Sequence, residues 1–177
     1  YDNLRTYNGY SFDFEAVAKE LFRVTKQGGV VVWVVGDATI KGSETGTSFR
    51  QALFFKECGF NLHDTMIYAK NNYMPHGGNR YGQQFEYMFV FSKSSPNTCN
   101  KIRIPCLTAG TKRYRGNEKK EAGMRARDII TTVNETKPLP NIWWFAVGKN
   151  DKTDHPAPFP ESLANDHIIS WSNEGDL

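Results

Sequence analysis

The segment from Val30 to Val35, VVVWVV, constrains the fold more than any other part of this 177-residue chain. It is rich in β-branched residues, it is apolar on both faces, and it ends at Gly36-Asp37. Such a run is typical of a strand that lies in the middle of a parallel sheet and is buried on both sides. It therefore predicts an α/β fold built around a parallel sheet.

Helical patterns flank this run on both sides. Before it, apolar residues from Phe14 to Phe22 recur at helical spacing, and Gly28-Gly29 follows as a stop. After it, a second helix is expected from about Thr47 to Cys58, ended by Gly59. A helix, a buried strand and another helix in this order indicate a wound sheet covered by helices.

Two further strands are expected, from Leu62 to Ala69 and from Phe85 to Ser92. The connection between them is rich in Gly, Asn and Pro and is too short for a crossover helix, so the strands are predicted to be antiparallel neighbours. The chain is predicted to return to ordered packing over 141–147 and to end in a short amphipathic helix. The apolar stripe expected for that helix consists of Leu163, Ala164, Ile168 and Trp171.

The middle of the chain differs from the rest in charge. Between Lys93 and Lys137 there are eleven basic residues against four acidic ones, which leaves the remainder at −4 although the whole chain carries +3. We therefore divide a single domain into a catalytic-half α/β core over 1–93, a basic insert over 94–140 and a return to the core over 141–177. Charge alone leaves two interpretations open, a surface for a polyanion or a solvated loop.

Composition argues against several classes of protein. No apolar run approaches the ~18 residues of a membrane helix, and the N-terminus lacks the regions of a signal peptide, so a soluble cytoplasmic protein is expected. The cysteines Cys58, Cys99 and Cys106 form no CxxC pair, so neither a disulfide framework nor a metal site is expected. The chain also lacks a phosphate-binding glycine motif and a Ser-His-Asp order, which disfavours nucleotide-binding proteins and hydrolases.

Two places carry side chains suited to binding. Asp37 follows the central strand, where open α/β sheets place their ligand crevice. The first ten residues, YDNLRTYNGY, combine aromatic and guanidinium planes that stack on bases with asparagines that bond base edges. A polar loop with aromatic packing at its ends is the alternative for these ten residues.

The segment 155–163, HPAPFPESL, has prolines at alternate positions before the last predicted helix. Each proline fixes its own φ and pushes the preceding residue out of the α region, so the segment is stiff and extended. This stiffness either steers the chain into the helix or holds a surface still against a ligand.

Taken in order, the segments resemble the N6-adenine and N4-cytosine DNA methyltransferases of the β type, in which the catalytic motif precedes the cofactor motif. The resemblance is carried by YDNLRTY at the start, ELFRVTKQGGVVVWVVGD (20–37), FEYMFVFSK (85–93), NIWWF (141–145) and HPAPFPESLANDHIISWSNEGDL (155–177). It implies a Rossmann-like fold that uses S-adenosylmethionine and contains an antiparallel strand pair. It also implies site-specific methylation of the exocyclic amino group of adenine or cytosine in duplex DNA.

Two departures from the family accompany the resemblance. Tyr1 matches the tyrosine of the family's (D/N/S)PPY motif, but the residues before that tyrosine are absent. The glycine-rich cofactor motif, which would follow Leu177, is absent as well. We therefore expect a central fragment of a methyltransferase, with a sheet that is incomplete at the cofactor end. A catalytically inactive DNA-binding module is the alternative.

The resemblance also implies roles for individual residues. Tyr1 is expected to stack on a target base that has been rotated out of the duplex. The residues expected to face S-adenosylmethionine are Asp37, His155, Pro156, Phe159, Pro160 and Glu161. The basic insert takes the place of the family's target-recognition region. The residues expected to contact DNA are Asn3, Arg5, Tyr7, Lys112, Arg113, Arg115, Lys119, Lys120, Arg125 and Arg127.

Overall fold

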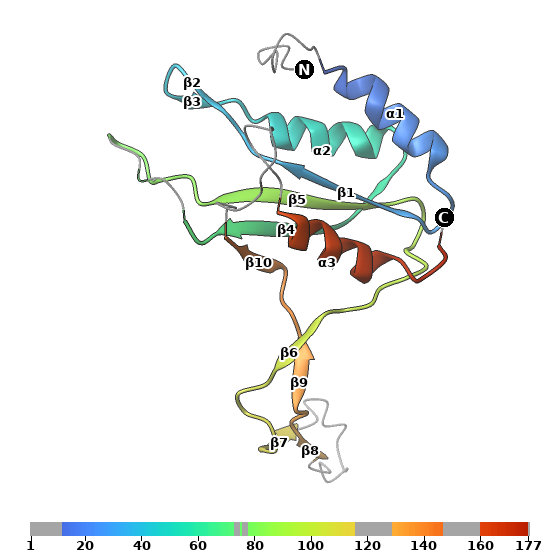
Figure 1. Cartoon of the computed structure of the whole chain (residues 1–177), viewed down its shortest axis with the longest axis vertical. Coiled ribbons are helices and arrows are strands. Elements are labelled where there is room, and N and C mark those ends of the chain that lie inside the picture. Colours follow the sequence, from blue (N-terminus) through green and yellow to red (C-terminus); the bar gives the residue numbers. More distant parts are fainter. Residues whose placement is uncertain (1–11, 73–74, 76–77, 116–128, 147–159, 177) are drawn as a thin grey trace, which may run out of the picture. The chain divides into compact units, whose positions relative to one another are not determined.

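The computed structural model describes residues 12–72, 75, 78–115, 129–146 and 160–176, which belong to two units. The first unit comprises Tyr1–Asn100 and Asn141–Leu177, and the second comprises Lys101–Pro140. Figure 1 shows both units in sequence colours. Within the described residues, no helix is long and apolar enough to cross a membrane.

The first unit is built on a mixed, mostly antiparallel sheet. Its strands, in spatial order, are β1 (Val30–Val35), β5 (Phe85–Ser92), β4 (Asn61–Lys70) and β10 (Ile142–Phe145). Its helices are α1 (Phe14–Val24), α2 (Thr47–Glu57) and α3 (Glu161–Trp171). A small hairpin of β2 (Thr39–Ile40) and β3 (Ser43–Glu44) lies between β1 and α2 in the sequence. The three expected helices are confirmed, as is the antiparallel pairing of β4 with β5.

The prediction that Val30–Val35 is a central strand of a parallel sheet is wrong. β1 pairs with β5 in antiparallel fashion, and among the described residues no strand pairs with its other edge. Across the described ranges, the one parallel pair of this sheet joins β4 and β10. The physical reason is that β5 inserts between β1 and β4, so two strands that run in the same direction are separated by an antiparallel one. All six residues of β1 are only half-buried.

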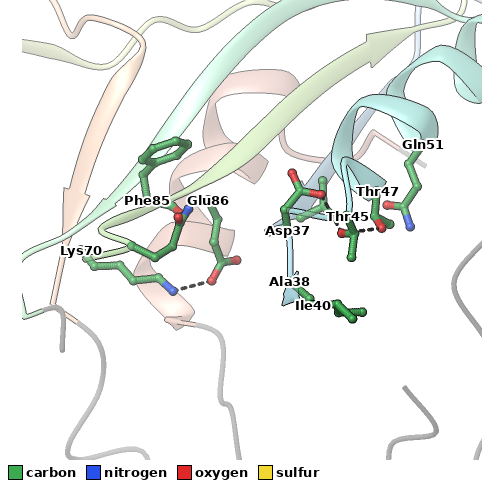
Figure 2. A pocket seen from close by; sticks show the side chains of 12 residues that line it. Asp37, Ala38, Ile40, Thr45, Thr47, Gln51, Lys70, Phe85 and Glu86 are labelled. Atoms are coloured by element: carbon green, nitrogen blue, oxygen red, sulfur yellow. Dashed lines mark hydrogen bonds and ion pairs between the residues drawn. The ribbon is translucent and has the colours of Figure 1, made fainter. Parts of the chain in front are cut away.

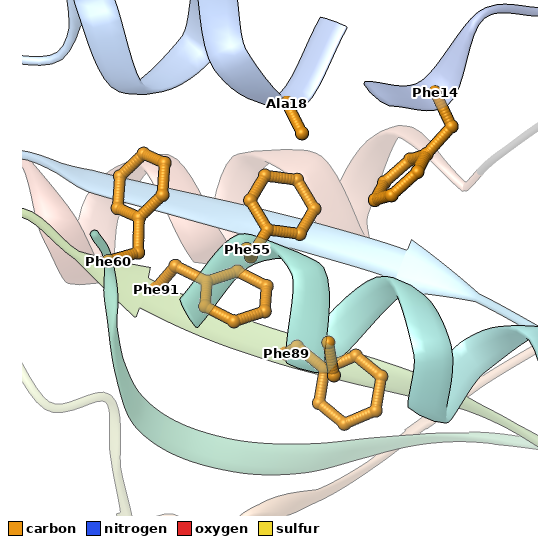
Figure 3. Packing of buried hydrophobic residues seen from close by; sticks show 7 residues of the cluster. Phe14, Ala18, Phe55, Phe60, Phe89 and Phe91 are labelled. Carbon is orange, nitrogen blue, oxygen red and sulfur yellow. The ribbon is translucent and has the colours of Figure 1, made fainter. Parts of the chain in front are cut away.

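One face of the sheet is covered by α1 and α2, and a largely aromatic cluster fills the space between these helices and the sheet (Figure 3). α1 begins with Asp13 as its cap, whose Oδ1 accepts a hydrogen bond from the Ala16 N–H at 3.1 Å. In the cluster the rings of Phe55 and Phe91 stack with their centroids 4.5 Å apart. Gly59 ends α2 with φ of 111°, and a Cβ there would lie 2.7 Å from the Phe22 ring, so this turn requires glycine.

The other face is covered by α3, but of the predicted apolar residues only Leu163 is fully buried. The residues that α3 buries are Leu163, His167 and Ser170, whereas Ile168 is 65% exposed. The His167 ring stacks on Trp143 with centroids 4.6 Å apart, and its Nε2 lies 3.2 Å from the Met88 sulfur. Two stripes, one residue apart, both fit helical spacing in this segment. The stripe that contains Ile168 was expected to be buried, yet the stripe that contains His167 packs on the sheet.

The second unit contains two antiparallel strand pairs. β6 (Arg103–Pro105) pairs with β9 (Thr136–Pro138), and β7 (Lys112–Arg115) pairs with β8 (Ile129–Thr132). Between the two pairs, the Cys106 backbone N–H donates a hydrogen bond to the Glu135 carbonyl at 2.8 Å. No described side chain of this unit is fully buried. Backbone pairing, rather than an apolar core, therefore holds its described part together.

Candidate functional site

A cavity of about 450 Å³ opens where β1 and β4 end. These strands run in the same direction on either side of β5, so their carboxyl ends lie at one edge of the sheet. Open α/β sheets bind ligands at this edge. The helix-side wall of the cavity consists of Asp37, Thr45, Thr47 and Gln51, and the strand-side wall consists of Lys70, Gln83, Phe85 and Glu86 (Figure 2). The remaining lining comes from Val35, Gly36, Ala38 and Ile40.

Asp37 holds the start of α2 in place. Its Oδ1 accepts hydrogen bonds from the Ser48 N–H at 3.0 Å and the Thr45 hydroxyl at 3.2 Å, and its Oδ2 accepts one from the Ser48 hydroxyl. Gly46 occupies the N-cap position and has no side chain to offer, so Asp37 supplies the cap from the end of β1. The negative charge also complements the positive end of the helix dipole. Asp37 therefore borders the cavity, but much of its hydrogen-bonding capacity is used inside the protein.

The other polar groups of the helix-side wall are paired as well. The Thr47 hydroxyl donates to the Thr45 hydroxyl at 2.9 Å. The Gln51 Oε1 accepts a hydrogen bond from the Trp33 indole N–H at 2.8 Å. This wall is a hydrogen-bonded network that fixes α2 against β1.

The strand-side wall carries an ion pair. Lys70 Nζ lies 2.5 Å from Glu86 Oε1, and the two side chains are 23% and 31% exposed. Glu86 passes close to the end of β1, because a Cβ on Gly36 would lie 3.3 Å from the Glu86 Cγ. In the described part of the chain, the second Glu86 carboxylate oxygen and two of the three Lys70 N–H groups have no hydrogen-bond partner. This wall therefore carries a charged acceptor and a charged donor with spare capacity.

Sequence analysis missed this pair, although a signal was present. Lys70 directly follows the predicted strand Leu62–Ala69, and Glu86 lies near the start of the strand Phe85–Ser92. In an antiparallel pair the end of one strand lies beside the start of the next, and here Tyr68 pairs with Glu86 in the register. Opposite charges at matching strand ends predict a contact of this kind.

Aromatic rings complete the strand-side wall. Phe85 is 36% exposed and is held edge-to-face by Tyr87, with ring centroids 5.4 Å apart. Tyr68 lies buried beside the ion pair, and Lys70 Nζ is 5.6 Å from its ring centroid. Burial raises the pKa of Tyr68, and the nearby Glu86 charge raises it further, so the phenol stays protonated at neutral pH. The wall thus combines a donor, an acceptor and an aromatic surface, which suits a flat polar ligand.

The structure places only some of the other candidates. Pro160 is buried at the N-cap of α3, and Glu161 is exposed in the first turn of that helix. Lys112 and Arg113 are exposed on β7, and Arg115 lies on the same strand with a side chain outside the described set. The candidates outside the described residues are Tyr1, Asn3, Arg5, Tyr7, Lys119, Lys120, Arg125, Arg127, His155, Pro156 and Phe159. Across the described ranges, no group of three or more His, Cys, Asp or Glu side chains is arranged to hold a metal ion.

Sequence comparison relates the whole chain to known methylases. A family model described as DNA methylase matches residues 1–177. The orphan methyltransferase M.BamHII of Bacillus amyloliquefaciens is 55% identical over 186 aligned residues, which cover 100% of this chain and 70% of that protein.

Structure comparison finds the same fold in two solved structures. The M1.HpyAVI–SAM complex matches with a TM-score of 0.53 and 19% identity, over 93% of this chain and 62% of that one. The cytosine-N4-specific PvuII DNA methyltransferase matches with a TM-score of 0.64 and 17% identity, over 96% of this chain and 58% of that one. The chain therefore spans less than two thirds of either structure, and the likeness shows a shared fold.

Proposed function

This chain belongs to the DNA methylase family of N6 and N4 enzymes, and on that premise we propose that it acts in transferring a methyl group from S-adenosylmethionine to the exocyclic amino group of adenine or cytosine in duplex DNA. The observation that carries the proposal is the position of the cavity. It lies at the carboxyl edge of the sheet and is lined by a donor, an acceptor and an exposed ring.

The chemistry demands a site of this kind. An exocyclic amino nitrogen is a weak nucleophile because its lone pair is delocalised into the ring. The base must therefore leave the duplex, stack on an aromatic plane and find acceptors for its amino protons. We assign the stacking plane to Tyr1, the tyrosine that matches the family's catalytic motif. Phe85 offers a second aromatic surface at the cavity.

S-adenosylmethionine supplies an electrophilic methyl group when it is bound. Two described residues, Glu161 and Pro160, have properties that suit binding of this cofactor. Glu161 has an exposed carboxylate with no ion-pair partner among the described residues, so it is free to accept hydrogen bonds from an ammonium or hydroxyl group. Pro160 is buried and fixes the backbone in front of it. We assign Asp37 to holding α2 instead, because three internal hydrogen bonds already occupy its carboxylate.

Duplex DNA is the partner that the second unit suits. Lys101, Lys112, Arg113 and Lys137 are exposed, and none of them forms an ion pair within the part of the unit that the structure describes. Cations that are free of carboxylates can neutralise phosphates and release counterions. Binding by this unit would supply affinity, whereas sequence choice requires contacts to base edges.

Methyl transfer is tested directly on duplex DNA of mixed sequence. The protein is incubated with the DNA and S-adenosylmethionine that carries an isotope-labelled methyl group, and the nucleosides are then separated by mass. We expect label in N6-methyldeoxyadenosine or in N4-methyldeoxycytidine. Tyr1→Ala should lower the rate, whereas Tyr81→Ala, at a fully exposed tyrosine outside the cavity lining, should not.

DNA binding is tested by its salt dependence. Between low and moderate salt the affinity should fall about tenfold or more. The double variant Lys112→Gln/Arg113→Gln should flatten this dependence, and Lys56→Gln, at an exposed lysine of α2, should not. Salt-dependent binding without any methylated nucleoside would favour an inactive DNA-binding module instead. Labelled methyl groups on carbon 5 of cytosine would contradict the proposed chemistry.

A further inference from the structure

Large apolar side chains of the edge strand β10 are exposed on the face of the sheet that carries α1 and α2. Trp143 of this strand packs on His167 of α3, with ring centroids 4.6 Å apart, so its neighbours Ile142 and Trp144 point to the opposite face. Ile142 is 46% exposed and Trp144 is 58% exposed. The part of the sheet around β10 therefore presents an apolar floor on this face.

This floor continues across two strands to α2. In the register, Ile142 lies beside Ile67 of β4, and Ile67 lies beside Tyr87 of β5. Both Ile67 and Tyr87 are only half-buried. The Tyr87 ring centroid lies 5.4 Å from that of Phe49, which is 52% exposed on α2. One row of apolar side chains thus runs from the edge strand to the helix.

α2 carries a second apolar stripe beside the one that it buries. Its buried stripe includes Ala52 and Phe55, and one of its flanks contacts α1 through Phe54. Phe49 and Leu53 lie one turn apart on the other flank, and Leu53 is 59% exposed. The helix therefore forms an apolar ridge beside the apolar floor.

We propose that this patch of ridge and floor binds a second copy of the chain. It consists of Phe49, Leu53, Ile67, Tyr87, Ile142 and Trp144. About a twofold axis, the α2 ridge of each copy lies on the β10 floor of the other, so each copy supplies what the other leaves uncovered. None of the six side chains is charged, so two copies bring no like charges together at the centre. The proposal does not depend on methyl transfer.

The size of the patch suits a dimer. Phe49, Leu53, Ile142 and Trp144 are each about half exposed and together offer on the order of 400 Å² of apolar surface. A standard interface covers about 800 Å² per partner, and in homodimers about 65% of that surface is apolar. Soluble monomers rarely leave a larger apolar patch open. The patch therefore supplies most of the apolar surface that one side of such an interface needs.

Sedimentation equilibrium tests the proposal, with a reducing agent present because Cys99 is exposed. At micromolar concentration the unchanged protein should have about twice the 20.2 kDa mass of one chain. Trp144→Glu and Leu53→Glu should each raise the dissociation constant about thirtyfold or more, because each buries a charge at the centre of the interface. Ile168→Glu is the matched control, at an exposed isoleucine of α3 outside the patch, and should leave the dissociation constant unchanged.

A mixture of two variants tests the reciprocal contact between α2 and β10. Leu53→Glu alone and Ile142→Lys alone should be monomers, because each places a charge against an apolar side chain twice. In a one-to-one mixture the introduced carboxylate meets the introduced ammonium group, and the second contact, between Leu53 and Ile142, is unchanged. The mixture should therefore sediment as a dimer. If α2 contacted α2 and β10 contacted β10, mixing would restore nothing.

Several results would overturn the proposal. The unchanged protein could remain a monomer up to submillimolar concentration, or its dimer could survive both Trp144→Glu and Leu53→Glu. A dimer that Ile168→Glu dissociates equally would place the interface on α3 instead. A mixture of Leu53→Glu and Ile142→Lys that stays monomeric would exclude the reciprocal contact. Circular dichroism checks that each variant is folded, and because Leu53 and Trp144 lie on different elements, one variant decides if the other unfolds.

Discussion

The helix-side and strand-side walls of the cavity each carry one carboxylate, and the protein uses the two differently. Asp37 accepts three hydrogen bonds from the loop and first turn that lead into α2, so its charge serves the fold. Within the described part of the protein, the Glu86 side chain has one partner, Lys70, and both side chains line the cavity with unused capacity. Both carboxylates lie beside the cavity, and it is the number of their internal partners that separates them.

Acid should destabilise the folded protein more than any single substitution described below. His167 of α3 packs on Met88 of β5 and on Trp143 of β10, and burial lowers the pKa of His167 from 6.5 to about 4. Between these values the unfolded chain takes up a proton that the folded protein excludes. Stability is therefore lost as the pH falls from 6.5 towards 4, by about 3 kcal/mol in total.

His167→Met isolates this effect, because methionine fills a similar space and does not titrate. Denaturant unfolding between pH 7 and pH 4 should show a shallower loss of stability for the variant than for the unchanged protein. The measured quantity is the difference between the two proteins in the slope of stability against pH, because all other groups protonate equally in the two proteins. Parallel curves would mean that the pKa of His167 is the same in the folded and unfolded states.

The next largest effect is expected on the helix-side wall. Asp37→Ala removes the cap of α2 and leaves the fully buried Ser48 hydroxyl without its partner. Losing a cap costs about 1 kcal/mol, and an unsatisfied buried hydroxyl costs a further 1 kcal/mol or more, so we expect a loss of about 2 kcal/mol in the free energy of unfolding. Asp37→Asn, which keeps an acceptor for the Ser48 N–H, should lose less than half of this. An Asp37→Ala protein with unchanged stability would show that the cap is dispensable.

A smaller effect is expected when the ion pair is broken. Lys70→Met leaves the half-buried Glu86 carboxylate unpaired, which we expect to cost about 1 kcal/mol. Arg23→Met removes an exposed pair on α1 and should cost under about 0.5 kcal/mol. Thermal unfolding of both variants in one buffer makes the comparison. Equal losses would mean that Lys70 and Glu86 behave as an ordinary surface pair.

The sequence predicted the helices and the antiparallel neighbours because each depends on local periodicity. It failed on β1 because an apolar run indicates a strand but does not show which strand lies beside it or how fully it is covered. It failed on α3 because Ile168 and His167 lie on adjacent stripes of one helix, and the choice between them is made by Trp143 and Met88 from distant elements. Contacts between elements are not encoded in spacing along one element.

The candidate site also has a part that the sequence predicts and a part that depends on contacts between distant elements. Asp37 was predicted as a site residue from its place after a strand, and it lines the cavity there. The sequence does not reveal that Thr45 and Ser48 occupy its carboxylate, because this depends on how the hairpin β2–β3 returns the chain to α2. Lys70 and Glu86 were accessible to prediction through the register of two strands whose pairing was already expected.

The smallest effect concerns the space between the end of β1 and the strand-side wall. An alanine Cβ at position 36 would lie 3.3 Å from the Glu86 Cγ, and the only atoms within 4 Å of it belong to Glu86. Replacing glycine by alanine at a compatible backbone position stabilises a protein by about 0.4–1 kcal/mol through the unfolded chain, and here the crowding should cancel most of that gain. Gly36→Ala alone should therefore change stability by only a few tenths of a kcal/mol.

The same substitution behaves differently once the crowding is removed. In a Glu86→Ala background Gly36→Ala should show the full stabilisation of about 0.4–1 kcal/mol, so the two changes should not be additive. Thermal unfolding of the two single variants and the double variant measures the coupling. If Gly36→Ala has the same effect in both backgrounds, Gly36 does not position Glu86, and the carboxylate is held by Lys70 alone.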